Sequence, residues 1–306
     1  MKVLFICRGK PKIGISPITK SQGESLQKEG VLLEYFVLEQ RGLKGYLKGI
    51  PLIRKHLKDN SYDVIHAHYW LSGIAAALAG AKPLLVSLMG DDVKKNSLKW
   101  LIYPFSYLFW SSIIVKSEDM YRTLGLKKAH IVPNGVDMDR FKPMEQRLAL
   151  QELKWDSNKR HILFPSDPAR VEKNFQLAKK AVEALDDDSV ELHYLKDVAM
   201  ERVPYYYNAS SVVILTSLWE GSPNAIKETM ACSVPIVSTD VGDVKKVVSK
   251  TEGCYIASFE YRDFSEAIKK ALKFNKRTTG REDIQYLKSE IVAQQIIDIY
   301  KNIKGI

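Results

Sequence analysis

Two glutamates, Glu220 and Glu228, are separated by seven residues and flank a turn that contains glycine. The turn consists of Gly221, Ser222, Pro223 and Asn224. It follows the apolar run 212–215, a predicted buried strand, and Asn224 begins a predicted helix. Glycine lets the backbone approach a ligand closely, and the N–H groups and dipole of a helix start favour phosphate. Because carboxylates accept hydrogen bonds from hydroxyl groups, the segment predicts a site for a ligand that carries a diphosphate and sugar-like hydroxyls.

The simpler interpretation is that both glutamates are solvated charges beside a structural turn. An isolated pair of glutamates would favour that interpretation, since acidic side chains are mostly exposed. Here, however, the order is strand, glycine turn and helix, and ligands of parallel sheets bind beyond the carboxyl ends of the strands. The order of the elements therefore favours a binding site.

The elements that position these residues form two similar series. In the first half of the chain, short β-branched runs predict strands, and the amphipathic stretches between them predict helices. Strands are expected at 3–6, 32–38, 63–66, 83–88, 111–115 and 130–132, with helices at 16–29, 46–58 and 70–78. Strands that are apolar throughout, without alternation, indicate a parallel sheet buried on both faces.

The series starts again after Pro143, and the polar stretch 146–159 is interpreted as a connection. Strands are predicted at 161–165, 191–194, 212–215, 235–238 and 254–257, with helices at 173–185, 224–232 and 262–274 and a final helix at the end of the chain. We therefore expect an α/β protein of two doubly wound, Rossmann-like domains, 1–145 and 146–306, that face each other across a ligand crevice. The final helix belongs either to the second domain or packs back on the first.

The composition is that of an ordinary globular protein. The chain has 306 residues, of which 45% are hydrophobic and 27% charged, enough for two domains with their own cores. Its three cysteines, Cys7, Cys232 and Cys254, are far apart in the sequence, which favours a reduced, cytoplasmic protein. No secretory signal is recognisable. The longest apolar run, 100–115, is interrupted by Pro104 and is too short for a membrane span, so a buried helix followed by a buried strand is expected there.

The segment around Glu220 resembles the Glu-x7-Glu motif of retaining GT-B glycosyltransferases, especially those of family 4. Further resemblances lie elsewhere in the chain. Residues 131–143 are similar to the family's interdomain-edge signature, 63–70 and 86–93 to strand ends of its N-terminal domain, and 204–210 to the segment before the motif strand. The resemblance covers most of the chain and is more specific in the C-terminal half.

The resemblance implies a role for each matching residue of the motif. Glu228 is expected to accept hydrogen bonds from the ribose hydroxyls of the donor nucleotide. Glu220 is expected to contact hydroxyls of the transferred sugar and to act in catalysis. The residues of the turn are expected to bind the donor, with the backbone of 222–224 against its diphosphate or its sugar.

The resemblance also implies phosphate-binding positions outside the motif. Lys173 matches a basic residue that neutralises the leaving diphosphate in the family. Pro168 stands where the family usually has an arginine, so Arg170 is expected to take over that part, and a plain surface charge is the alternative for Arg170. Gly14 and Ser16, between the first strand and the first helix, resemble the family's glycine-rich loop, here with a single glycine.

The acceptor side departs from the family's pattern at one position. The family often has a histidine where this chain has Met89, and a thioether is a poor hydrogen-bond partner for a sugar. Asp91, Asp92 or His68 is expected to help instead. Strand alternation places His66 and His68 on one face, and a packed histidine at a strand end is the equally plain alternative for His68.

The implied reaction is the transfer of a sugar from a nucleotide sugar, a UDP- or GDP-sugar in the first place, to a hydroxyl acceptor with retention at the anomeric carbon. No Asp-x-Asp or histidine cluster of the sequence marks a metal site, so neither a cofactor nor a required metal is expected. A dinucleotide-dependent oxidoreductase would need Gly-x-Gly-x-x-Gly, which residues 8–14 do not provide. A non-catalytic protein that binds sugar nucleotides stays open as an alternative, because Met89 weakens the acceptor side. Nucleic-acid binding has only the basic charge in its favour.

The excess of positive charge lies in the first half of the chain. Residues 1–140 contain 21 basic and 12 acidic side chains, a difference of +9, whereas residues 141–306 contain 25 and 24, a difference of +1. Because the resemblance assigns the acceptor to the N-terminal domain, this charge favours a phosphorylated acceptor such as a lipid-linked glycan precursor. The predicted helix 45–58 mixes apolar and basic residues, which is typical of a helix on an anionic membrane, although a helix with an apolar core-facing side fits as well. We expect a peripheral enzyme on the inner face of the membrane.

Overall fold

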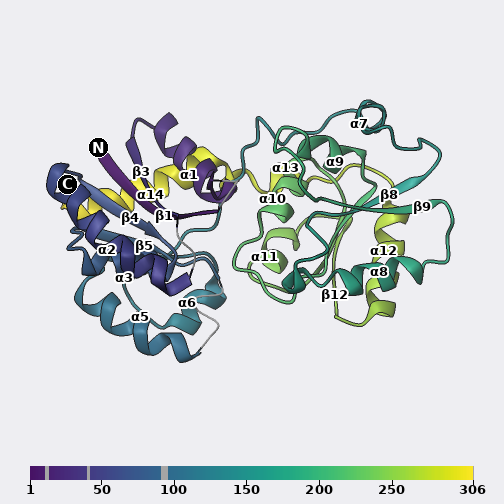
Figure 1. The fold of residues 1–306 in the computed structure, drawn as a ribbon. Coiled ribbons are helices and arrows are strands. Elements are labelled where there is room, and N and C mark those ends of the chain that lie inside the picture. Colours follow the sequence, from purple (N-terminus) through teal and green to yellow (C-terminus); the bar gives the residue numbers. More distant parts are fainter. Residues whose placement is uncertain (11–13, 40–41, 91–95, 306) are drawn as a thin grey trace. The chain divides into compact units, whose positions relative to one another are not determined.

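The computed structural model describes residues 1–10, 14–39, 42–90 and 96–305, which form two units (Figure 1). The first unit contains residues 1–135 and 289–306, and the second unit contains residues 136–288. The boundary follows Gly135 and not residue 145, because Val136, Met138 and Phe141 are buried in a core cluster of the second unit. The final helix, α14 (Ser289–Lys304), belongs to the first unit.

A mostly parallel sheet forms the centre of the first unit. Its strands are β1 (Lys2–Lys10), β2 (Gly14–Ile15), β3 (Leu32–Leu38), β4 (Val64–His68), β5 (Leu84–Ser87), β6 (Ser112–Val115) and β7 (Ala129–Ile131). β1 pairs in parallel with both β3 and β4, the sheet continues through β5, β6 and β7, and β2 pairs antiparallel with β1. The strand order therefore reverses beside β1, which is where ligands bind in doubly wound sheets.

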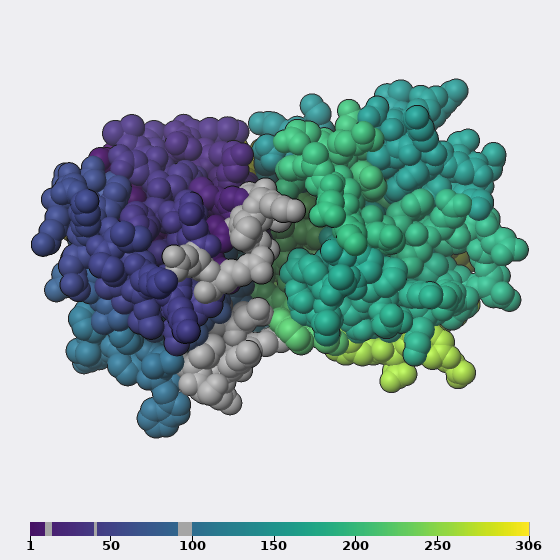
Figure 2. Space-filling model, in the orientation of Figure 1, coloured from purple at the N-terminus to yellow at the C-terminus, as the bar shows by residue number. Residues whose placement is uncertain are grey.

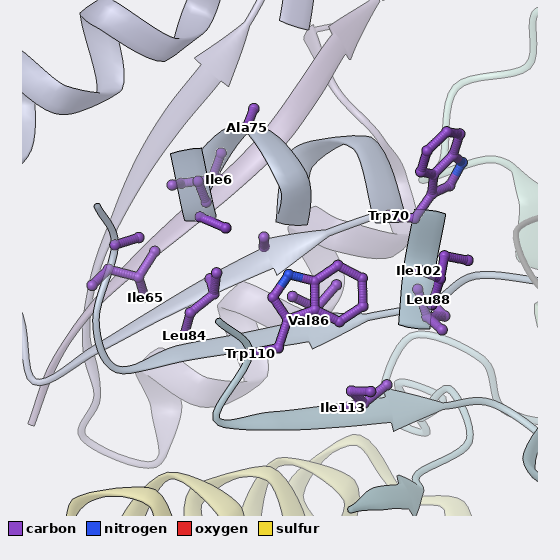
Figure 3. Packing of buried hydrophobic residues seen from close by; sticks show 14 of the residues in the cluster. Ile6, Ile65, Trp70, Ala75, Leu84, Val86, Leu88, Ile102, Trp110 and Ile113 are labelled. Atoms are coloured by element: carbon purple, nitrogen blue, oxygen red, sulfur yellow. The ribbon is translucent and has the colours of Figure 1, made fainter. Parts of the chain in front are cut away.

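Alternate residues of β1 pack into two different cores, because successive side chains of a strand point to opposite faces. Leu4 and Ile6 belong to the cluster formed with α2, α3, α5 and α6, which Figure 3 shows with Trp70 and Ala75 of α3. Val3 and Phe5 belong to the cluster formed with α1 and α14. The helices are α1 (Pro17–Lys28), α2 (Gly42–Asp59), α3 (Trp70–Leu78), α5 (Asn96–Leu108) and α6 (Glu118–Leu124).

The second unit has a fully parallel sheet in the order β12-β11-β10-β8-β9. Its strands are β8 (Arg160–Phe164), β9 (Val190–Tyr194), β10 (Val212–Leu215), β11 (Ile236–Thr239) and β12 (Cys254–Ala257). Ile162 and Phe164 pack with α8 (Phe175–Glu183) and α12 (Tyr261–Phe274). Leu163 packs on the other face with α9 (Val203–Ala209), α10 (Asn224–Ala231) and α11 (Val244–Val248). Two short helices, α13 (Gly280–Asp283) and η2 (Gln285–Leu287), precede α14.

Two helices of the second unit differ from the sequence-based expectation. The stretch 146–159 is not only a connection, because it contains α7 (Gln146–Leu153), and Ala149 and Leu150 of this helix pack against Ala209 of α9. The helix expected from residue 173 starts later. A short 3-10 helix, η1 (Val171–Lys173), comes first, and Asn174 then adopts a left-handed conformation with φ of 52° before α8 begins.

Helix α5 does not lie buried as the apolar run 100–115 predicted. Ile102 faces the core, but Trp100 and Tyr107 are 84% and 85% exposed, and Leu108 is also exposed. Figure 2 shows the atoms of α5 at the lower surface of the first unit. Among the helices that the structure describes, none is both long enough and apolar enough to cross a membrane.

Candidate active site

The turn between β10 and α10 is held against the loop that follows β11. Ser222 donates a hydrogen bond of 2.6 Å to Oδ2 of Asp243. Gly242 has a φ of +60°, and a Cβ atom at this position would come within 2.5 Å of the carbonyl oxygen of Gly221. This close approach requires glycine at position 242 and fixes the turn from which α10 begins at Asn224.

Lys173 and Glu220 form an ion pair between two loops of the second unit. Lys173 ends η1 in the loop after β8, whereas Glu220 lies in the loop after β10, and their side chains are only 13% and 15% exposed. Ser217 donates a hydrogen bond of 2.7 Å to Oε1 of Glu220, and Thr216 donates one of 2.9 Å to the carbonyl oxygen of Lys173. These contacts bring together, at the carboxyl ends of β8 and β10, two residues that the sequence assigned to catalysis.

Glu228 lies in the second turn of α10, and Oε2 of its carboxylate accepts a hydrogen bond of 2.7 Å from the hydroxyl of Tyr207 in α9. Burial raises the pKa of Glu228, and the Tyr207 hydrogen bond and the charge of Arg140 counteract this shift. Burial also raises the pKa of Tyr207 well above 10.0, so its hydroxyl stays a donor. The sequence singled out neither Tyr207 nor Arg140. Residues 205–207 are all tyrosine, so the sequence alone does not tell which of them reaches Glu228.

A buried ion pair between Lys227 and Asp243 contacts Ser222 of the glycine turn. Lys227 is fully buried, its ammonium group lies 3.1 Å from Oδ2 of Asp243, and it also donates a hydrogen bond to the hydroxyl of Ser222. Burial lowers the pKa of Lys227, while the Asp243 carboxylate acts in the opposite direction. The sequence analysis identified neither Lys227 nor Asp243. A lysine next to Glu228 on an amphipathic helix is normally predicted to be a solvated charge.

Arg170 is paired with Glu172 in this structure. Its guanidinium lies 2.7 Å from Oε1 of Glu172, and 54% of its side chain is exposed. The sequence-based expectation that Arg170 binds the diphosphate therefore stays a prediction. Lys173 is the basic residue that the structure brings beside Glu220.

Gly14 of the glycine loop lies in β2, which pairs with the end of β1. Lys10 pairs with Gly14 and Gly9 with Ile15, in antiparallel register. The hydroxyl of Ser16 accepts a hydrogen bond of 3.3 Å from the backbone N–H of Thr19, so Ser16 caps α1. Gly14 and Ser16 thus lie at the start of a helix, next to the carboxyl end of β1.

His66 and His68 stack on each other on one face of β4, with ring centroids 4.4 Å apart. His66 is hydrogen-bonded to Tyr300 (2.7 Å) and Ser87 (2.8 Å). His68 is only 3% exposed, and neither of its ring nitrogens has a hydrogen-bond partner among the residues that the structure describes. Burial, with a smaller contribution from the charge of Lys116, lowers the pKa of His68 to about 3. His68 is therefore a neutral, packed side chain.

The two remaining acceptor-side predictions, Asp91 and Asp92, lie outside the described residues. A group of three side chains that could hold a metal ion does lie within the described part of the second unit. It consists of His161, Glu191 and His193, and it includes none of the residues that the sequence assigned to the site.

The second unit thus places the ammonium group of Lys173, the carboxylates of Glu220 and Glu228 and the start of α10 around one glycine turn. Lys173 and the start of α10 can bind an anion, because both present positive charge or partial charge. Glu220 and Glu228 can accept hydrogen bonds from hydroxyl groups on either side of that anion. The arrangement suits a ligand with a central diphosphate.

Two family descriptions match the chain, one in each half. The family "Glycosyl transferases group 1" matches residues 160–273, which contain the glycine turn and both glutamates. The family "Glycosyltransferase Family 4" matches residues 18–140 of the first half.

Curated relatives have similar names. A UDP-Gal:alpha-D-GlcNAc-diphosphoundecaprenol alpha-1,3-galactosyltransferase of Escherichia coli is 26% identical over a match that covers 72% of this chain and 69% of the relative. A D-inositol 3-phosphate glycosyltransferase of Xylanimonas cellulosilytica is 27% identical over a match that covers 69% of this chain and 64% of the relative. The chain thus matches about two thirds of the length of these relatives.

Solved structures of glycosyltransferases share the fold over its whole length. A sucrose-phosphate synthase of Thermosynechococcus elongatus superposes with a TM-score of 0.83 at 15% identity and covers 100% of this chain and 99% of its own. HepE of Anabaena, solved in complex with UDP and glucose, superposes with a TM-score of 0.73 at 16% identity and covers 99% and 100%. These similarities establish the GT-B fold, and together with the two family matches they show that the chain belongs to the group 1, family 4 glycosyltransferases.

Proposed function

We propose that this glycosyltransferase transfers a sugar from a UDP-sugar to a hydroxyl of a lipid-linked glycan precursor, with retention of the anomeric configuration. The observation that carries the proposal is the Lys173–Glu220 ion pair beside the turn that leads into α10 and Glu228. It provides one site for a diphosphate, with a carboxylate on each side for the ribose and for the sugar.

In the proposed complex, the donor diphosphate binds between Lys173 and the start of α10. The ammonium group of Lys173, which is paired with Glu220 in the structure, then gains a second anionic partner. Glu220 can in turn accept hydrogen bonds from hydroxyls of the sugar, and Glu228 from those of the ribose. Binding of the nucleotide sugar thereby adds several charge-assisted hydrogen bonds to the existing ion pair.

The chemical step would proceed through an oxocarbenium-like transition state, in which the bond from the anomeric carbon to the diphosphate oxygen breaks. The acceptor hydroxyl oxygen would bond to that carbon from the same face, and its proton would pass to the departing diphosphate. Negative charge then grows on the departing diphosphate, and Lys173 and the helix start stabilise it without moving far. Since these groups already supply positive charge, we propose that the reaction requires no metal ion. Activity that persists in EDTA would support this part of the proposal, and activity that returns only with added Mg²⁺ or Mn²⁺ would contradict it.

Comparison with the relatives supports uridine as the donor base. The Escherichia coli relative is named for UDP-Gal, and HepE was solved with UDP and with UDP-glucose. A panel of UDP-, GDP- and ADP-sugars tests the choice through thermal stabilisation, because a ligand at 100 times its Kd stabilises a protein by about 2.7 kcal/mol. Stabilisation by UDP-sugars alone is expected, and stabilisation by GDP-sugars alone would replace uridine with guanosine.

The same relative supports a lipid-linked acceptor, since its printed name places the acceptor sugar on diphosphoundecaprenol. The surface of the first unit fits such an acceptor. Trp100, Tyr107 and Leu108 of α5 are exposed, and so are Leu47 and Leu52 of α2. α3 packs against both α2 and α5, which places these apolar side chains on neighbouring helices of one unit.

Basic side chains accompany this apolar surface. Lys44, Lys48 and Lys55 of α2 are exposed, and Arg54 is exposed while it donates a hydrogen bond to the carbonyl oxygen of Leu78. Aromatic residues that enter the headgroup region and lysines that face anionic lipid are the two ingredients of interfacial binding. We therefore propose that the first unit attaches the enzyme to the inner face of an anionic membrane, where its acceptor lies.

A further inference from the structure

We propose that His161, Glu191 and His193 form a binding site for one divalent transition-metal ion, with Zn²⁺ as the preferred ion. This site is separate from the donor site and does not depend on the proposed function. Its ligands come from β8 and β9, and β9 is the edge strand of the second sheet. The ion would clamp this edge strand to its neighbour.

The register of the two strands brings the three side chains together. His161 and Glu191 are directly paired in the parallel ladder between β8 and β9. His193 lies two residues beyond Glu191, so the alternation of a strand directs both side chains to the same face. The backbone of regular secondary structure, and not a loop, therefore positions all three ligands.

The distances between the ligand atoms are within a few tenths of an ångström of those around a metal ion. Nδ1 of His161 lies 2.9 Å from Nε2 of His193, and each of these nitrogens lies 3.7 Å from Oε2 of Glu191. Bonds of about 2.0–2.2 Å at tetrahedral angles keep ligand atoms roughly 3.3–3.6 Å apart. Small side-chain adjustments would make the triangle regular, and a fourth position would remain for water.

The surrounding contacts orient the ligands for binding. Nε2 of His161 lies 2.8 Å from the carbonyl oxygen of Asp156, so this nitrogen holds the ring proton and Nδ1 presents its lone pair to the site. A ligating histidine typically donates its other N–H to such a carbonyl. The ring of His193 stacks on Trp155, with centroids 3.6 Å apart and planes 12° from parallel. Both imidazoles are therefore fixed by contacts that do not use the ligand atoms.

The composition of the ligand set also favours a bound cation. Lys159 pairs with Oε1 of Glu191 at 2.6 Å and leaves Oε2 directed at the two histidines. The lysine reduces the net negative charge of the site, so neutral imidazole nitrogens supply most of the affinity. Two imidazoles and one carboxylate form a ligand set that suits Zn²⁺ more than Mg²⁺ or Ca²⁺.

The test measures metal binding directly on the full, untagged chain after dialysis against EDTA. Titration calorimetry with Zn²⁺ should show one tight site per chain, and Co²⁺ should produce the visible absorption of a four-coordinate complex. Glu191→Gln and His193→Gln should each weaken Zn²⁺ binding by about 100-fold or more. Loss of a residue that only hydrogen-bonds to a metal ligand already weakens metal binding by about 10- to 100-fold, and loss of a ligand should cost at least as much. Both side chains are partly exposed, and melting curves without metal check that the variants fold.

His130→Gln serves as the matched control, because His130 is exposed and belongs to the other unit. This variant should bind Zn²⁺ as the unchanged chain does. Zn²⁺ should also raise the melting temperature of the unchanged chain but not that of His193→Gln. The absence of one-to-one binding, or Zn²⁺ binding by Glu191→Gln and His193→Gln as tight as that of the unchanged chain, would overturn the proposal.

Discussion

The hydroxyl of Tyr207 in α9 donates a hydrogen bond of 2.7 Å to the carboxylate of Glu228 in α10. This contact lowers the cost of holding a carboxylate in a buried position, but burial still raises the pKa of Glu228 overall. Glu228 therefore destabilises the ligand-free fold in its charged form. A residue kept for ligand binding at the expense of stability is common at functional sites.

The first prediction concerns the pH dependence that this raised pKa causes. Below the ordinary pKa of 4.5, the folded and unfolded states both hold the proton, so Glu228 costs no stability. As the pH rises from 4.5 through the higher folded pKa, the unfolded state ionises more readily, and stability is lost. Glu228→Gln should therefore raise the melting temperature at pH 7 and leave it nearly unchanged at pH 4. A melting temperature at pH 7 below that of the unchanged chain would contradict this prediction.

The second prediction compares the two motif glutamates in kinetics. Glu228→Ala should raise the KM for the donor, because the ribose contact would act equally in the ground state and the transition state. Glu220→Ala should mainly lower kcat, because Glu220 is paired with Lys173 beside the proposed leaving group. Initial rates over a range of donor concentrations separate the two effects. Unchanged kinetics in both variants would show that the donor binds elsewhere.

The third prediction separates the two basic residues after β8. Lys173→Ala should lower kcat/KM by about tenfold or more, since a charge-assisted contact contributes about 1.5–3 kcal/mol. Arg170→Ala should cost less, because this side chain is exposed and paired with Glu172. Arg170→Ala is thus the matched control for removing one positive charge from the same loop. A larger loss for Arg170→Ala would mean that the arginine turns toward the diphosphate in the complex.

The fourth prediction concerns the buried pair of Lys227 and Asp243. Lys227→Ala leaves a carboxylate without its cation, and Oδ1 of Asp243 already has no hydrogen-bond partner within the described part of the chain. Removing one partner of a buried pair costs about 3–5 kcal/mol, which urea denaturation measures. Lys246→Ala, an exposed lysine of α11, should change stability little. A loss below about 1 kcal/mol for Lys227→Ala would contradict a structural role for the pair.

The motif and its elements could be predicted because their signals are local. The apolar run 212–215 and the helix from Asn224 appear as β10 and α10 with the same starts, since glycine and proline separate them. The order of strands along the chain likewise indicated doubly wound sheets. Such patterns depend on neighbouring residues, which a sequence shows directly.

The partners of the site residues could not be predicted, because they come from distant segments. Tyr207 lies 21 residues from Glu228, and Asp243 lies 16 residues from Lys227. Nothing in the sequence tells which of three tyrosines reaches the carboxylate, or that Lys227 faces inward. For Trp100 the sequence predicted burial, but the side chain is exposed. An apolar run alone does not distinguish a helix face in the core from one on the surface.

The last prediction tests the proposed attachment of the first unit to membranes. Vesicles with increasing anionic lipid should sediment an increasing fraction of the enzyme, because each lysine or arginine near the surface contributes about 1 kcal/mol. Salt should weaken this binding, since the Debye length shortens from about 30 Å at 0.01 M to about 10 Å at 0.1 M. The double variant Trp100→Ala, Tyr107→Ala should reduce binding further at high salt, because these rings, 84% and 85% exposed, contribute an apolar part that salt does not screen. Phe259→Ala in the second unit, where the ring is 50% exposed, is the matched control and should bind like the unchanged chain. Equal, negligible binding to neutral and anionic vesicles would instead favour an acceptor in solution.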